Sequence, residues 1–356
     1  MQKGIIFVPF MTGKGGTETV IHNLFKSIKS NKNLNLKVYS IGGSFNYDWT
    51  NGVNANIQEI SNSRGIRTLY YLTFLPHKIA KIIKKEKPDF VISTNPVMWF
   101  LSKKIIKNKN LKIPVIAWYH YSLKQKPIRK MFLKSADYYF AISSGIKAQL
   151  ISQGIPQECI SLIYNPVDSN YYPISRPNDG ITHFIYLGRV DLDKQKNVRE
   201  LLTALQNVKG NWVLDIYGDD KKAAPAKELA SQLNISEKIN WKGFVTNPWS
   251  EIKNASVLTL TSNYEGLPMV LIEAISHGVC CVSSNIETGP IDIIKNGTNG
   301  YLYKPHEVNQ LTELLKKIVN NQLPLPSQKQ IIESSKKFSL DSYGKYLSNA
   351  IHKALN

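Results

Sequence analysis

The stretch Glu265-Gly266-Leu267-Pro268-Met269-Val270-Leu271-Ile272-Glu273 carries the strongest structural signal in the chain. The apolar, β-branched run that precedes it, residues 257–261, is typical of a buried strand. Residues 269–277 are predicted to form a helix with Pro268 in its first turn, where the missing N–H costs nothing. A strand that leads directly into a helix is the unit from which parallel α/β sheets are built.

Two carboxylates lie at the ends of this stretch. Glu265 is expected on the strand-to-helix loop, beside helix N–H groups that have no partner within the helix. Glu273 follows two helical turns later and is expected to face the same crevice. Because ionised carboxylates accept hydrogen bonds and hydroxyl groups donate them, this pair suits a polyhydroxylated ligand held at both ends. The alternative is an ordinary strand–helix unit with one exposed Glu and one Glu in a salt bridge.

The same alternation of strands and helices runs through the whole chain, in two halves. Strands are predicted near residues 4–10, 36–41, 89–94, 113–119, 137–142 and 160–164, and again near 183–187, 212–217, 239–242, 256–261, 280–284 and 300–303. Helices between such strands imply two doubly wound parallel sheets, which bind ligands at the carboxyl ends of their strands. Residues 165–181 are the expected linker, and helices are expected at 328–337 and 340–355.

Composition is consistent with a two-domain protein of a reducing compartment. The chain has 356 residues, 42% of them hydrophobic, and three cysteines that make no disulfide framework. No cleavable leader is predicted, and no stretch approaches the roughly 20 apolar residues of a membrane span.

Positive charge is concentrated in the first half. Residues 1–165 contain 24 Lys and Arg against 7 Asp and Glu, whereas the net charge of the whole chain is +19. Such an excess favours an anionic partner, either a membrane surface or a phosphorylated glycolipid, and the alternative is an ordinary solvated lysine face. The sequence shows no helix-turn-helix, zinc or RNA-recognition signature, so nucleic acid is not expected. A basic amphipathic helix, residues 78–87, and residues 103–112 are candidates for contact with lipid headgroups.

Glycines and basic residues follow several of the predicted strands. Gly15 and Gly16 open the first helix, where backbone N–H groups can approach a phosphate. The loop is neither a dinucleotide fingerprint nor a Walker A motif, and a plain tight turn is the alternative. Gly188-Arg189 and Lys196 lie in one later loop, where an Arg and a Lys can neutralise a diphosphate. Solvated basic residues are the alternative.

Other candidates are less specific. Asp191 and Asp193 resemble a metal-binding D-x-D pair, but basic residues flank them and no metal site is predicted. Gly218 and Val245 end two strand regions that can wall a nucleobase pocket, or that form plain turns. His120 follows the strand at 113–119 and is expected at the mouth of the crevice, with a packed structural histidine as the alternative.

Together these elements resemble the family 4 retaining glycosyltransferases of the GT-B fold, over essentially the whole chain. The resemblance rests on Gly15-Gly16-Thr17-Glu18, Asn165-Pro166-Val167-Asp168, Gly188-Arg189 with Lys196, and the Glu265–Glu273 stretch. The segments 136–138, 141–147 and 288–294 are similar to those of lipopolysaccharide core α-1,6-galactosyltransferases. Many family members have the Arg and the Lys five apart, so the longer interval here leaves Lys194 open as the phosphate ligand, although helix position favours Lys196.

The resemblance implies an architecture. Two Rossmann-like doubly wound domains would face a central crevice, with residues 1–165 binding the acceptor and residues 166–335 binding the nucleotide sugar. Residues 336–356 would form a helix that returns to the N-terminal domain.

It also implies the roles of the candidate residues. Arg189 and Lys196 would bind the donor diphosphate, with Gly15 and Gly16 approaching it from the other domain. Glu265 would hold the donor sugar's hydroxyls, and His120 would contact the sugar from the acceptor side. Glu273 would hold the ribose. The remaining donor-binding positions would be Gly188, Gly218, Val245, Gly266, Leu267, Pro268 and Met269.

The expected activity is metal-independent, retaining transfer of a hexose to a lipopolysaccharide core or other lipid-linked oligosaccharide, at the inner face of the cytoplasmic membrane. UDP-galactose is the favoured donor. UDP-glucose or UDP-N-acetylhexosamine transfer in capsule or other polysaccharide synthesis is an alternative. More remote ones are a nucleotide-sugar 2-epimerase and a non-enzymatic binder of anionic surfaces.

Overall fold

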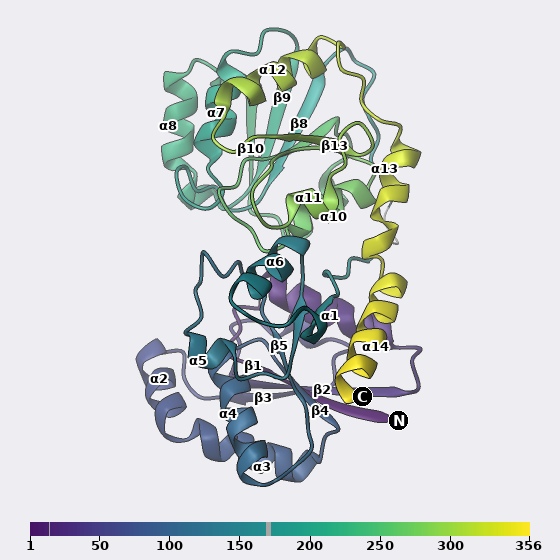
Figure 1. Cartoon of the computed structure of the whole chain (residues 1–356). Coiled ribbons are helices and arrows are strands. Elements are labelled where there is room, and N and C mark those ends of the chain that lie inside the picture. The colour runs from purple at the N-terminus through teal and green to yellow at the C-terminus, as the bar shows by residue number, and fades with distance from the viewer. Residues whose placement is uncertain (14, 169–171) are drawn as a thin grey trace. The chain divides into compact units, whose positions relative to one another are not determined.

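The computed structural model describes residues 1–13, 15–168 and 172–356 (Figure 1). It divides into two compact units. Unit 1 comprises Met1–Asp168 and Phe338–Asn356, and unit 2 comprises Ser169–Lys337. Part of the predicted linker, residues 169–171, lies outside the described residues.

Unit 1 is built on a seven-stranded parallel sheet of order β3-β2-β1-β4-β5-β6-β7. The strands are β1 (Gln2–Val8), β2 (Leu34–Gly42), β3 (Ala55–Glu59), β4 (Phe90–Ser93), β5 (Val115–Trp118), β6 (Tyr138–Ala141) and β7 (Ile160–Leu162). The helices are α1 (Gly16–Ile28), α2 (Arg64–Thr73), α3 (Leu75–Glu86), α4 (Pro96–Asn108), α5 (Lys130–Leu133), α6 (Ser144–Ser152) and α14 (Leu340–Leu355). The central strands are continuous apolar runs because helices cover a parallel sheet on both faces.

Unit 2 repeats the design with a six-stranded parallel sheet of order β10-β9-β8-β11-β12-β13. Its strands are β8 (Thr182–Leu187), β9 (Trp212–Tyr217), β10 (Ile239–Gly243), β11 (Val257–Leu260), β12 (Cys280–Ser284) and β13 (Gly300–Tyr303). Its helices are α7 (Val198–Gln206), α8 (Ala224–Gln232), α9 (Pro248–Glu251), α10 (Met269–Ser276), α11 (Pro290–Ile293), α12 (Val308–Val319) and α13 (Gln328–Ser335). Two Rossmann-like parallel sheets confirm the predicted fold class.

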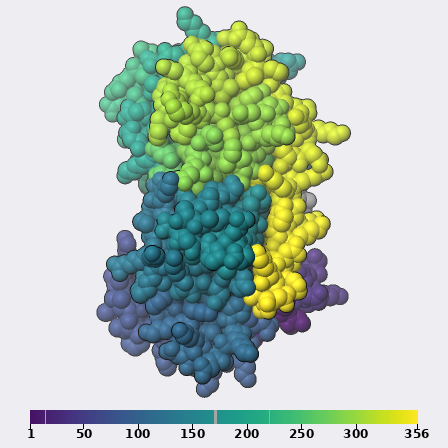
Figure 2. Space-filling model, in the orientation of Figure 1, coloured from purple at the N-terminus to yellow at the C-terminus, as the bar shows by residue number. Residues whose placement is uncertain are grey.

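The last helix of the chain packs on the first unit. Helix α14 contacts α1, and its exposed side forms part of the surface of unit 1 (Figure 2). The backbone N–H of Val167 donates to the carbonyl of Phe338 over 2.9 Å. Nearby, the amide of Asn23 donates to the carbonyl of Pro166 over 3.0 Å. The expected return of the C-terminal helix to the N-terminal domain is therefore confirmed.

Two local features differ from the expectation. Strand β3 was not predicted, because its sequence Ala-Asn-Ile-Gln-Glu lacks a run of apolar residues and forms an edge strand. Pro268 is the N-cap of α10 rather than a residue of its first turn. The isoleucines of the basic helix α3 are buried, so the lysine side that was expected to contact headgroups is the side that faces solvent.

Among the described residues, no helix combines the length and apolar character needed to cross a membrane.

Candidate active site

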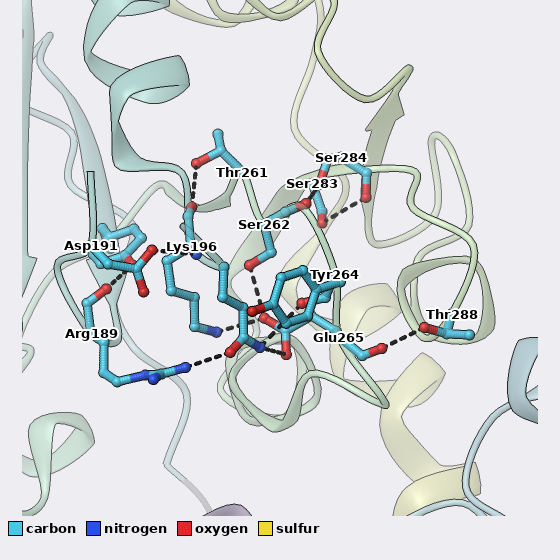
Figure 3. A network of polar contacts seen from close by, with 12 residues as sticks. Arg189, Asp191, Lys196, Thr261, Ser262, Tyr264, Glu265, Ser283, Ser284 and Thr288 are labelled. Carbon is cyan, nitrogen blue, oxygen red and sulfur yellow. Dashed lines mark hydrogen bonds and ion pairs between the residues drawn. The ribbon is translucent and has the colours of Figure 1, made fainter. Parts of the chain in front are cut away.

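The candidate residues of unit 2 gather at the carboxyl edge of its sheet. Gly188 directly follows β8, Gly218 directly follows β9, and Glu265 lies on the loop between β11 and α10. Since these neighbouring strands are parallel, their carboxyl ends open on the same edge. Residues far apart in the sequence therefore share one site (Figure 3).

Two loops are joined at this edge by hydrogen bonds. The backbone N–H of Asn263 donates to the carbonyl of Gln195 over 2.8 Å, and its side-chain amide donates to the carbonyl of Lys194 over 2.6 Å. The hydroxyl of Thr261 donates to the carbonyl of Lys196 over 3.2 Å. The loop after β8 is thus held against the loop after β11, which fixes the position of the side chains that both loops carry.

The carboxylate of Glu265 accepts hydrogen bonds from three side chains. Its Oε1 lies 2.7 Å from Nζ of Lys196 and 2.8 Å from the hydroxyl of Ser262. Its Oε2 accepts from the amide of Gln195 over 3.3 Å. The side chains of Lys196 and Glu265 are only 13% and 10% exposed. An ion pair that is so shielded from water is a stronger interaction than a surface pair.

Arg189 enters the same network through Gln195. The Arg189 guanidinium donates to Oε1 of Gln195, while Nε2 of Gln195 also donates to the carbonyl of Tyr264 over 3.1 Å. The arginine side chain is otherwise exposed. Lys194 is exposed as well, and Lys196 is not.

The Gly-Leu-Pro turn is supported from a third loop. The hydroxyl of Thr288 donates to the carbonyl of Glu265. Gly289 has a φ of +100°, and a Cβ at this position would lie 2.5 Å from Cδ of Pro268. The residue at 289 must therefore be glycine for the turn to keep this shape.

Close backbone packing explains Gly218, which lies against Gly188. The N–H of Gly188 donates to the carbonyl of Tyr217 over 3.0 Å, and the N–H of Gly218 donates to the carbonyl of Gly243 over 2.8 Å. A Cβ on Gly218 would lie 2.4 Å from the carbonyl oxygen of Gly188. Val245 follows β10 by two residues and is half-buried.

Glu273 is oriented by an aromatic neighbour. The indole N–H of Trp249 donates to its Oε2 over 2.9 Å, and the Trp249 ring stacks on His277 with centroids 4.7 Å apart. Desolvation by burial raises the pKa of Glu273, and the Trp249 hydrogen bond opposes that rise. Its carboxylate is therefore a desolvated acceptor with one oxygen already bonded to the indole.

The two aspartates of the D-x-D pair have other partners. Asp191 accepts from the backbone N–H of Lys196 over 2.8 Å. Asp193 pairs with the guanidinium of Arg199 at 2.5 and 3.1 Å. In the described part of the chain no group of three or more His, Cys, Asp and Glu side chains is placed to hold a metal ion.

The glycine loop of unit 1 is ordered by an acidic side chain. Gly15 is the N-cap of α1, and Gly16 is its first residue. Glu18 is buried, and its Oε1 accepts from the hydroxyl of Thr12 over 2.9 Å and from the N–H of Gly13 over 2.8 Å. A Cβ on Gly15 would lie 2.6 Å from Oε2 of Glu18, whereas one on Gly16 would meet nothing within 4 Å. Of these two glycines, only Gly15 has a neighbour that a Cβ would displace.

His120 lies two residues beyond β5 in unit 1. Its ring packs on Trp118 with centroids 4.5 Å apart. Its Nε2 is buried and has no hydrogen-bond partner within the described ranges. Desolvation lowers the pKa of His120 to about 3, so the imidazole is neutral at physiological pH.

The structure thus brings Arg189, Lys196 and Glu265 together with the Gly-Leu-Pro turn in unit 2, while Gly15, Gly16 and His120 belong to unit 1. Sequence reasoning missed the residues that orient these groups: Gln195, Ser262, Trp249, Thr288 and Glu18. Thr288 and Glu18 stand within the segments on which the family resemblance rests, but no residue pattern indicated their contacts.

Two sequence families match the chain in tandem. The family described as glycosyl transferases group 1 matches residues 172–338, and the family described as glycosyltransferase family 4 matches residues 14–171. The boundary between the two matches lies close to the division between the structural units.

Similar proteins match over nearly the full length. The lipopolysaccharide 1,6-galactosyltransferase of Escherichia coli K12 is 33% identical over 90% of this chain and 89% of that protein. Its namesake from Salmonella typhimurium is 31% identical over 97% of both chains. The solved structure of the lipopolysaccharide outer core galactosyltransferase WaaB in its apo form superimposes with a TM-score of 0.87 at 30% identity, covering 98% of this chain and 99% of that one. The chain therefore belongs to the glycosyltransferases that pair a family 4 domain with a group 1 domain.

Proposed function

We propose that this glycosyltransferase transfers a hexose, galactose from UDP-galactose, to a lipopolysaccharide core or another lipid-linked oligosaccharide. The observation that carries the proposal is the Lys196–Glu265 pair, with Arg189 joined to it through Gln195. It provides cationic donors for a diphosphate and carboxylate acceptors for sugar hydroxyls in one network. The similarity to lipopolysaccharide 1,6-galactosyltransferases supports the choice of sugar and acceptor.

Lys196 and Arg189 would stabilise the leaving nucleoside diphosphate. One of the three ammonium N–H groups of Lys196 is directed to Glu265, which leaves two for phosphate oxygens. Its shielded position beside Gly188 favours Lys196 over the exposed Lys194 as the phosphate ligand. Arg189 is exposed except for its contact with Gln195, so its fork can take two phosphate oxygens.

Glu265 would hold the hydroxyls of the donor sugar. The backbone N–H groups of Gly266, Leu267 and Met269 would contribute donors from the same turn, in which Pro268 has no N–H. The Oε2 of Glu265 carries a single hydrogen bond from Gln195 and therefore retains capacity to accept. Glu273 would accept from the ribose hydroxyls, with Trp249 fixing its orientation.

The other donor contacts would be made by backbone. Gly188, Gly218 and Val245 would line the nucleotide-binding region at the carboxyl edge of the second sheet. Gly15 and Gly16 would approach the diphosphate with the N-terminus of α1, where unpaired N–H groups carry partial positive charge.

His120 would contact the donor sugar as a neutral imidazole. Its buried Nε2 has no partner within the described ranges, and an unpaired buried nitrogen is costly unless a ligand satisfies it. Because it is neutral, this nitrogen can accept from or donate to a hydroxyl according to its tautomer.

The reaction would retain the anomeric configuration. The bond from the anomeric carbon to the β-phosphate oxygen breaks, and the acceptor oxygen bonds to the same face of an oxocarbenium-like sugar. The acceptor proton passes to the departing phosphate, so no protein nucleophile is assigned. Positive charge positioned at the leaving oxygens lowers the barrier by several kcal/mol without a metal ion.

The site of action would be the inner face of the cytoplasmic membrane. A lipid-linked acceptor resides in a bilayer, and the 24 Lys and Arg against 7 Asp and Glu in residues 1–165 suit an anionic surface. Peripheral attachment therefore fits both the acceptor and the charge.

Release of the nucleoside diphosphate in a donor screen tests the proposal. UDP-galactose, UDP-glucose, UDP-N-acetylhexosamines, and GDP- and ADP-sugars are incubated with and without purified lipopolysaccharide core oligosaccharide, in EDTA. We expect acceptor-dependent UDP release from UDP-galactose and an α-linked product by NMR. Preference for another donor would refute the sugar assignment. Loss of activity in EDTA that Mg²⁺ or Mn²⁺ restores would refute metal independence.

A further inference from the structure

Helix α2 of unit 1 has its apolar side turned outward. Ile66, Leu69 and Leu72 are 56%, 64% and 76% exposed, and Phe74 directly after the helix is 61% exposed. Every residue of α2 is described, and none is buried. A surface helix of a globular domain ordinarily packs its apolar stripe against the core, so α2 has the reverse orientation.

The opposite side of α2 packs on the rest of unit 1 through hydrogen bonds and a cation–π contact. The hydroxyl of Tyr71 accepts from the N–H of Phe10 over 3.3 Å and donates to the carbonyl of Ile41. The Arg67 guanidinium lies 3.8 Å from the centroid of the Phe10 ring, and its Nη1 donates to the carbonyl of Ser61 over 2.7 Å. These contacts fix which side of the helix faces solvent.

These contacts place α2 at the carboxyl edge of the first sheet. Phe10 follows β1 by two residues, and Ile41 lies at the end of β2. The glycine loop at Gly15 begins at the same edge. The outward apolar side is therefore attached to the edge from which this fold binds its ligands.

Positive charge predominates in the segment of the sequence that contains this helix. Residues 61–112 contain 12 Lys and Arg against 2 Asp and Glu. One of those acids, Glu86, is buried and paired with Lys3 and Lys37 at 3.0 and 3.2 Å. Helix α3 follows α2 directly, with Lys81, Lys84 and Lys85 exposed.

We propose that α2 seats unit 1 on an anionic lipid bilayer, with Ile66, Leu69, Leu72 and Phe74 at the boundary between headgroups and acyl chains. The apolar side supplies insertion and the neighbouring lysines supply attraction to lipid phosphates, the two terms that drive interfacial helices onto membranes. A second copy of this chain would oppose like charges, which disfavours self-association through the same surface. The inference rests on the proposed function only in that the acceptor is lipid-linked.

Vesicle co-flotation of the full chain tests the apolar contribution. The variant Leu69→Ser/Leu72→Ser is compared with Met131→Ser/Ile151→Ser, which removes two other exposed apolar side chains of unit 1, 59% and 40% exposed. With phosphatidylcholine vesicles containing phosphatidylglycerol, the α2 variant should bind roughly 100-fold more weakly, since each of its two leucines is worth about a factor of ten when buried. The control variant should bind like the wild type.

A fluorophore reports insertion directly. Leu72→Cys in a Cys159→Ser background is labelled with an environment-sensitive dye, because Cys280 and Cys281 are buried. Its emission should shift to the blue with vesicles containing phosphatidylglycerol and stay unchanged with phosphatidylcholine alone. Equal vesicle binding by the α2 variant, or no emission shift, would overturn the inference. So would a concentration-dependent dimer that the α2 variant abolishes.

Activity assays separate this inference from the proposed function. Transfer from UDP-galactose to a short soluble core oligosaccharide should be the same in the wild type, the α2 variant and the control variant. Transfer to acceptor embedded in anionic vesicles should fall only in the α2 variant. If the soluble acceptor is not glycosylated by any of the three, the proposed function fails while vesicle binding still tests α2.

Discussion

The side-chain amide of Gln195 donates a hydrogen bond to Oε2 of Glu265 over 3.3 Å. Its carbonyl oxygen accepts from Arg189, so one neutral side chain links the cation assigned to the diphosphate with the carboxylate assigned to the sugar. A side-chain amide has both a carbonyl acceptor and N–H donors, so it can accept from the arginine and donate to the carboxylate at the same time.

Replacing Gln195 should therefore impair turnover more than donor binding. Gln195→Ala leaves Arg189 and Glu265 present but unlinked, and a small misplacement of reacting groups can cost about 100-fold in rate. We expect kcat to fall roughly 10–100-fold with KM for the donor changed much less. Gln232→Ala on the exposed surface of α8 is the matched control. Unchanged kcat in Gln195→Ala would mean that the two groups hold their positions independently.

Replacing Glu265 and replacing Glu273 should have different effects on binding and turnover. Glu273→Ala removes ribose hydrogen bonds that act in the ground and transition states alike, so UDP binding should weaken by roughly 10-fold or more. Glu265→Ala should leave UDP affinity nearly intact and depress kcat. Calorimetric titration with UDP, combined with steady-state kinetics, measures both, and the reverse ranking would exchange the two assignments.

Arg189→Ala and Lys196→Ala should each cost about 2–4 kcal/mol of transition-state stabilisation, the scale of losing one preorganised electrostatic group. The value is obtained from kcat/KM with UDP-galactose. Lys194→Ala is the internal control, because its exposed side chain is expected to matter little. A larger loss for Lys194→Ala than for Lys196→Ala would identify Lys194 as the phosphate ligand.

His120 should remain neutral through the physiological range. Because burial lowers its pKa to about 3 from 6.5, the unfolded chain takes up this proton first as the pH falls. The contribution of His120 to stability is therefore constant above about pH 6.5 and decreases as the pH falls from there toward about 3. In NMR spectra of histidine-labelled protein, the resonances that His120→Asn removes should not titrate between pH 5 and 8. Titration near pH 6.5 would show a solvated imidazole.

The exposed lysines of α3 should contribute attraction without insertion. Lys81→Glu/Lys84→Glu/Lys85→Glu should weaken binding to anionic vesicles by roughly 100-fold or more, at about 1 kcal/mol for each lysine near the surface. Wild-type binding should itself fall with salt, because charges are screened over about 8 Å at physiological ionic strength. Lys253→Glu/Lys317→Glu/Lys329→Glu makes the same charge change at exposed positions of unit 2. An equal loss of vesicle binding in both triple variants would show that the effect comes from net charge and not from the position of the lysines on α3.

Much of the fold could be predicted from sequence because parallel strands are buried on both faces. Runs such as residues 257–260 and 280–284 are apolar or small throughout and are bounded by turns. Strand β3 gave no such signal, since an edge strand with a polar face needs only its neighbour β2 to form. The orientation of helix α2 could not be predicted either, because it depends on contacts of Tyr71 and Arg67 with Phe10, which is distant in the sequence.

The site could be predicted only at the level of its charged residues and glycines. Glu265, Arg189 and Lys196 stand out because their residue types suggest an ion or ligand. Gln195 and Thr288 do not, since a neutral amide or hydroxyl in a loop is usually solvated. Their importance arises from the pairing of loops that are distant in the sequence. Gln195 and Glu265, for example, are 70 positions apart.

The contact of Gly289 with Pro268 has a consequence for exchanging donor preference between relatives. The shape of the turn after Glu265 depends on a glycine with a φ of +100° that lies more than 20 positions downstream, beside a threonine bonded to the Glu265 carbonyl. Grafting residues 265–273 from another enzyme would import the side chains but not the surface against which they fold. A chimera that keeps its specificity must carry residues 288–290 along, so the two segments form one exchangeable unit.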